Sequence, residues 1–122
     1  MRAALAGDLE RLKILLAGGA DVNERNDEGR TALIFAAINR ETSIAKELLE
    51  NGADVNPKAN NGGTALMFAA SEGDADLVKV LLSKGADVSS KFTETGQTAL
   101  QLAREHGYDD IVELLQAAGA KE

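Results

Sequence analysis

The apolar residues of this chain recur at helical intervals in two kinds of segment. Leu77–Leu82 carries an apolar stripe that predicts a helix with one buried face, and Ile44–Leu49 carries the same stripe earlier in the chain. A shorter, alanine-rich segment precedes each stripe and starts with a threonine, a preferred helix N-cap. The pattern therefore predicts pairs of helices, a short alanine-rich helix followed by an amphipathic one.

These pairs repeat at a fixed period. The motif Gly-Ala-Asp-Val occurs at residues 19–22, 52–55 and 85–88, and each copy lies 33 residues after the last. A second motif, Thr-Ala-Leu, starts at Thr31, Thr64 and Thr98, with spacings of 33 and then 34. One unit therefore has an extra residue. Ala3-Ala4 matches Ala36-Ala37 at the same period, which indicates a truncated first copy.

Glycines mark the ends of most of the predicted helices. Gly73 and Gly107 follow alanine-rich helices, whereas Gly52 and Gly85 follow amphipathic ones, and a left-handed glycine commonly ends a helix. Each unit is predicted to be a helix, a turn, a second helix and a hairpin loop. A unit of this size cannot bury its own apolar face, so its stability must come from stacking on its neighbours.

The units resemble those of the ankyrin-repeat family. The resemblance rests on Gly-x-Thr-Ala-Leu-x-x-Ala-Ala, on Leu-Val-Lys-Val-Leu-Leu at Leu77–Leu82 and on Gly-Ala-Asp-Val-Asn, and it covers nearly the whole chain. Alanine replaces the family's usual proline after each threonine, and both suit the first helical turn. Ile34, Met67 and Gln101 replace the usual histidine. The resemblance implies an all-α solenoid of stacked helix-turn-helix units joined by β-hairpin-like loops.

We expect a single ankyrin-repeat domain over residues 1–122. Its expected parts are an N-terminal capping repeat at 1–26, repeats at 27–59 and 60–93, and a C-terminal capping repeat at 94–122. Arg11 and Gln116 stand where the other copies carry apolar residues. A polar residue suits the outer face of a terminal repeat, which has no neighbour and contacts water. We therefore expect both ends to be capped and the array to be complete.

Composition narrows the classes of partner. A net charge of −7 disfavours nucleic acid and anionic membranes, because both are bound through clustered Lys and Arg, and it favours a basic or neutral partner face. The chain has no cysteine, and no segment approaches the ~18 apolar residues of a membrane span. We expect a cytoplasmic protein, and a monomer.

The sequence offers no arrangement of reactive groups. His106 is the only histidine and lies beside Gly107, where a surface position is expected. Asp109-Asp110, like Asp74 and Asp76, suit helix starts better than a metal site. Asn61-Gly62-Gly63 lacks the residues of a phosphate-binding loop. We expect no catalysis, no metal and no cofactor.

Protein binding is what the resemblance implies instead. In the family, partners dock along a concave face formed by the hairpin loops and the ends of the first helices. The matching loop positions are Asp27, Glu28, Arg30, Asn60, Asn61, Gly63, Glu94, Thr95 and Gln97. The matching helix ends are Ile38, Asn39, Ser71, Glu72, Glu105 and His106. Side chains at these positions differ between copies while the framework repeats. Such variation is expected of a binding surface, but sequence drift alone also produces it.

Two apolar residues suggest contact points. Ile38 stands where the other copies carry Ser71 and Glu105, and it is either an exposed anchor for a partner or a contact with a neighbouring loop. Phe92 lies in the hairpin with the extra residue. It either reaches a ligand or folds back and covers the last repeat.

Two polar residues break the repeat pattern. Arg40 replaces the helix-ending glycine of the second copy, so Arg40 or Asn39 is expected to adopt the left-handed conformation. Glu47 replaces Val80 and Leu114, and we expect it at the rim with its carboxylate in water.

Two functions remain in competition. The first is a protein-binding adaptor or inhibitor, and the alternative is a structural or engineered scaffold without a partner of its own. Arg40, Glu47 and the extra residue are irregularities that an idealised design would omit, which favours a natural sequence or one derived from it.

Overall fold

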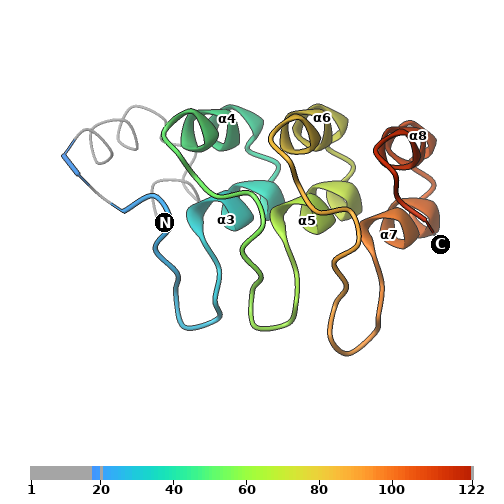
Figure 1. The fold of residues 1–122 in the computed structure, drawn as a ribbon, viewed down its shortest axis with the longest axis horizontal. Coiled ribbons are helices and arrows are strands. Elements are labelled where there is room, and N and C mark those ends of the chain that lie inside the picture. Colours follow the sequence, from blue (N-terminus) through green and yellow to red (C-terminus); the bar gives the residue numbers. More distant parts are fainter. Residues whose placement is uncertain (1–17, 20, 122) are drawn as a thin grey trace.

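The computed structural model describes residues 18–19 and 21–121, which contain three pairs of antiparallel helices. The first helices of the pairs are α3 (Ala32–Ile38), α5 (Ala65–Glu72) and α7 (Ala99–Glu105). The second helices are α4 (Thr42–Glu50), α6 (Ala75–Ser83) and α8 (Asp109–Ala117). The two sets form two parallel rows, with hairpin loops projecting beyond the row of first helices (Figure 1). The expected all-α repeat solenoid is confirmed.

Threonine caps start all three first helices. The Thr31, Thr64 and Thr98 hydroxyls accept hydrogen bonds from the amides of Ile34, Met67 and Gln101. At α7 the Gln101 side chain also accepts from the Thr98 amide, which completes a capping box. The threonines predicted as N-caps therefore have that role.

The first helices end in two ways. α5 ends at Gly73, which is left-handed with a φ of 80°, as the glycine pattern predicts. α3 has no glycine there, and Arg40 adopts a φ of 56° instead. The left-handed conformation thus falls on Arg40, while Asn39 serves as the C-cap.

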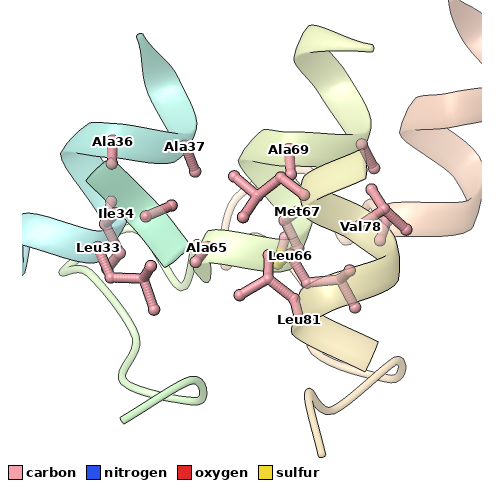
Figure 2. Close-up of a cluster of buried hydrophobic side chains, with 14 of the residues drawn as sticks. Leu33, Ile34, Ala36, Ala37, Ala65, Leu66, Met67, Ala69, Val78 and Leu81 are labelled. Carbon is pink, nitrogen blue, oxygen red and sulfur yellow. The ribbon is translucent and has the colours of Figure 1, made fainter. Parts of the chain in front are cut away.

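Aliphatic side chains fill the space between neighbouring repeats. Figure 2 shows the contacts of α5 with α3 and with α6, where Leu33, Leu66, Met67 and Leu81 are fully buried. Alanines such as Ala69 let the helices approach closely. Each first helix contacts its own second helix, and α5 also contacts α3 and α7, so the core is a continuous layer.

Asparagines also join consecutive repeats. Asn23 Oδ1 accepts from the Asp54 amide at 2.8 Å, and Asn56 Oδ1 accepts from the Asp87 amide at 2.7 Å. Ser89 replaces this asparagine in the next unit, and its amide and hydroxyl both donate to the Asp87 carboxylate. These hydrogen bonds lower the pKa of Asp87 below its ordinary value.

Several expectations fall on residues that are not described. The Arg11 position, the Ala3-Ala4 copy and most of the 1–26 repeat lie outside the described residues. Glu47 lies inside them, is half-buried, and its carboxylate accepts from Asn51 at 2.9 Å.

Candidate functional site

Three hairpin loops form one edge of the molecule, at residues 24–30, 57–63 and 90–97 (Figure 1). We call them hairpins 1, 2 and 3. In hairpin 1 the Asn26 amide donates to Arg30 O, and in hairpin 2 the Ala59 amide donates to Gly63 O. Hairpin 3 closes by the Phe92 amide donating to Gln97 O, so it encloses one more residue.

The extra residue of hairpin 3 lies at its tip. Gly29 and Gly62 donate to carbonyls three residues earlier, whereas Gly96 donates to Phe92 O, four residues earlier. The base of the hairpin is regular, with an isolated antiparallel bridge between Lys91 and Thr98. The insertion therefore enlarges the turn and leaves the junction with α7 unchanged.

Hairpins 2 and 3 are each hydrogen-bonded to the hairpin before them. The Asn60 amide donates to Glu28 O at 2.8 Å, and the Thr93 amide donates to Asn61 O at 3.0 Å. The backbones of hairpins 2 and 3 lie very close together at Gly62. A Cβ added there would lie only 2.6 Å from the Lys91 carbonyl oxygen. The hairpins therefore form a connected edge in which backbone groups hold the loops together.

Some predicted site residues use their side chains inside this framework. Asn60 Nδ2 donates to Asp27 O, and Asn61 Oδ1 accepts from the Gly63 amide. Asn39 Nδ2 donates to Phe35 O and Thr95 Oγ1 accepts from the Gln97 amide. These side chains fix the loops and helix ends on which the other residues stand.

Of the residues predicted for this face, Gly63 is buried, and the others are exposed or half-buried. Exposed side chains are those of Asp27, Glu28, Asn39, Asn60, Asn61, Glu94 and Thr95. Half-buried are Arg30, Ile38, Ser71, Glu72, Phe92 and Gln97. Gln97 Nε2 contacts Glu105 Oε2 at 2.5 Å, which connects hairpin 3 to the end of α7. At hairpin 3, the loop and the end of its first helix thus meet on one face.

The two apolar candidates are both packed against the protein. Ile38 is half-buried beside the core, which fits a packing contact better than a fully exposed anchor. Phe92 lies edge-on to Phe68 of α5, with ring centroids 5.7 Å apart. Phe92 therefore folds back, but toward α5 rather than over the last repeat.

Hairpin 1 holds a small charged arrangement that the sequence did not indicate. The guanidinium of Arg30 lies over the ring of Phe35, with 5.6 Å from Cζ to the centroid. Glu28 Oε2 lies 3.7 Å from Arg30 Nη1. The sequence pattern does not mark Phe35 or Phe68 as site residues, because their segments predict buried helix, whereas both rings are half-buried and reach the loops.

The candidate chemical groups have structural roles. His106 Nδ1 contacts Leu102 O at 2.8 Å, and the ring stacks on Tyr108. Asp74 is the N-cap of α6, while Asp109 and Asp110 lie in the first turn of α8. In the part of the chain that the structure describes, no group of three or more His, Asp or Glu residues is placed to hold a metal ion. Nor is any helix there long and apolar enough to cross a membrane.

Stacked helix pairs with connected hairpins define a solenoid repeat protein. A family model described as "Ankyrin repeats (3 copies)" matches residues 1–92, and one described as "Ankyrin repeat" matches residues 95–121. The chain belongs to the ankyrin-repeat family, whose members are generally protein-interaction modules and typically not enzymes.

One curated relative is the mitochondrial disaggregase of Bos taurus. It is 48% identical over 46 residues, which is 38% of this chain and 7% of that protein. The chain thus covers a small part of that relative's length. A match of this extent is shorter than two repeats, so it reflects the repeat and carries no argument about activity.

Proposed function

We propose that this chain is a non-catalytic adaptor or inhibitor that binds a protein partner. Its binding face consists of the hairpin tips and the ends of the first helices. The observation that carries the proposal is the backbone bonding between hairpins, from Asn60 to Glu28 and from Thr93 to Asn61. Because backbone groups hold the loops together, side chains such as Asp27 and Glu94 stand on a fixed support and need little ordering on binding.

The side chains on this face favour protein over other partners. They combine acidic, amide and partly exposed aromatic groups, as in Glu94, Asn61 and Phe92. Aromatic residues supply contact area, whereas phosphate recognition needs clustered cations. We propose no nucleic-acid or membrane partner, no cofactor, a cytoplasmic location and a monomeric state.

Affinity capture from a cell extract tests the proposal. The immobilised chain is compared with Asp27→Lys/Ile38→Ser at about 0.05 M and about 0.3 M salt, which differ in screening. Ser is the residue that the next repeat carries at this position. We expect a protein enriched by the parent chain to bind the variant roughly tenfold less, as measured with the purified partner.

The matched control is Glu50→Lys, an exposed charge reversal on α4 in the row of second helices. Both variants are first checked for a parent-like circular dichroism spectrum and melting temperature. A partner lost equally with Glu50→Lys, or kept by Asp27→Lys/Ile38→Ser, would contradict binding at this face. If no protein is enriched, a scaffold without its own partner is the better description.

A further inference from the structure

Hairpin 1 shows how this face holds a guanidinium group. Arg30 lies with its Cζ 5.6 Å from the centroid of the Phe35 ring and with Nη1 3.7 Å from the Glu28 carboxylate. The cation is attracted by the negative face of the ring and by the acid together. In hairpin 1, an arginine guanidinium is thus contacted by an aromatic ring of a first helix and by an acid at a hairpin tip.

The next repeat carries a glycine in place of the arginine but keeps the aromatic residue. Gly63 occupies the position of Arg30, and Phe68 occupies that of Phe35. The space above Gly63 is taken by the ring of Phe92, since a Cβ on Gly63 would lie 2.8 Å from Phe92 Cε1. An aromatic ring therefore replaces the guanidinium here, and no arginine of this chain stands at the equivalent position.

The exposed part of the Phe92 ring lines a surface hollow of about 280 Å³. Its other lining residues are Asn61, Glu94, Thr95 and Gln97. None of these side chains is basic, and the Glu94 carboxylate is exposed. Lys91 precedes Phe92 in the same strand-like segment and lines a separate hollow together with Lys121. The hollow beside Phe92 therefore combines an aromatic surface, an acid and amide side chains, without a cation.

We propose that this hollow binds an arginine side chain of a protein partner. The guanidinium lies against Phe92, pairs with Glu94 and hydrogen-bonds the amide oxygens of Asn61 or Gln97. Arginine is favoured over lysine because its planar group both stacks on a ring and donates several hydrogen bonds. The chain's net charge of −7 adds a general attraction for a basic segment. The inference rests on the proposed protein-binding face and specifies the chemistry that the face recognises.

A titration followed by ¹H–¹⁵N NMR tests the site on the full chain. The probe is the tripeptide acetyl-Gly-Arg-Gly-amide, and its uncharged isostere contains citrulline in place of arginine. We expect saturable shifts of the backbone amides of Asn61, Phe92, Glu94, Thr95 and Gln97. The citrulline peptide should bind at least about fivefold more weakly, because it lacks the charge that the ring and the acid attract.

Two substitutions separate the contributions to binding. Phe92→Leu keeps an apolar side chain but removes the ring, and Glu94→Gln keeps the size but removes the charge. Each should weaken the arginine peptide roughly two- to fivefold. Glu94 is exposed at a loop tip, so Glu94→Gln keeps the test informative if Phe92→Leu disturbs the fold. Glu113→Gln on α8 removes an exposed acid elsewhere and should leave the affinity unchanged.

Several outcomes would overturn the proposal. They are the absence of shifts at the hollow, shifts spread over acidic residues elsewhere, equal binding of the citrulline peptide, or an affinity indifferent to Glu94→Gln. A partner that docks on the hairpin face while the arginine peptide ignores the hollow would remove this inference only. Conversely, specific arginine binding here, with every captured partner docking elsewhere, would leave the site and remove the proposed face.

Discussion

Arg40 has a positive φ, 56°, at a position where α5 and α7 are followed by glycine. A side chain in this conformation brings its Cβ close to the following carbonyl oxygen, which glycine avoids. We expect Arg40→Gly to raise the free energy of unfolding by about 0.5–1 kcal/mol, measured by urea denaturation. Lys46→Gly, at an exposed interior position of α4, should instead lower it by about 1 kcal/mol. A destabilised Arg40→Gly variant would show that the contacts of the arginine side chain outweigh the backbone strain.

Gly63 is required for a different reason, namely lack of space. An added Cβ would lie 2.8 Å from atoms of both the Phe68 and the Phe92 rings. We expect Gly63→Ala to lower the free energy of unfolding by about 1–2 kcal/mol, because the rings must move apart. The double variant Gly63→Ala/Phe92→Leu should recover part of this loss relative to Phe92→Leu alone. Strictly additive effects in urea denaturation would argue against the clash.

At the residue scale, the sequence predicted local roles better than contacts. Thr64 as an N-cap and Gly73 as a helix end follow from positions within one segment, and both were confirmed. The packing of Phe92 on Phe68 was not predictable, because the alternatives differ only in the direction of a side chain. The hydrogen bond from Asn60 Nδ2 to Asp27 O was not predictable either, since it joins residues 33 apart.

Among the elements, α6 begins at an aspartate with two partners. Asp74 Oδ1 accepts from the Leu77 amide, and Asp74 Oδ2 accepts from the Thr42 hydroxyl at the start of α4. Asp74→Ala should therefore lower the free energy of unfolding by about 2–3 kcal/mol. Thr42→Val, which removes only the link between the two helices, should lower it by about 1 kcal/mol.

Asp74→Asn serves as the control for this prediction. An asparagine oxygen caps a helix as well as a carboxylate does, so the loss should stay below about 1 kcal/mol. A double-mutant cycle of Asp74→Ala with Thr42→Val then measures the link itself. No coupling between the two positions would mean that the 2.5 Å contact between Thr42 and Asp74 contributes nothing to stability.

The helices themselves were predictable because apolar spacing and caps agree within each segment. The stripe at Leu77–Leu82 lies within α6, and Ile44–Leu49 lies within α4. The hairpins were less predictable from the sequence. The spacing of the threonines indicated an extra residue, but only the bond from Gly96 to Phe92 O places it at the tip. The hydrogen bonds between neighbouring hairpins join backbone groups that are far apart in the sequence, so the residues of one segment do not indicate them.

For the molecule as a whole, the main contacts among the described helices lie within one repeat or between adjacent repeats. Leu66 in α5 is fully buried between repeats, whereas Leu115 is fully buried in α8, the last helix. Both Leu→Ala variants should lose about 3 kcal/mol locally. We expect Leu66→Ala to lower hydrogen-exchange protection in the helices on both sides, and Leu115→Ala to lower it mainly in α7 and α8. Equal loss of protection everywhere in both variants would contradict a chain of nearest-neighbour interfaces.

The enlarged tip of hairpin 3 has a consequence for how such proteins diversify. Its extra residue leaves the Lys91–Thr98 bridge and the Thr98 cap of α7 in place. Because the bridge and the cap are kept, a residue can be added at this point without changing the start of α7. The length of each hairpin is then a trait that selection can alter independently of the others. New surface shapes can arise along one ancestral framework, one loop at a time.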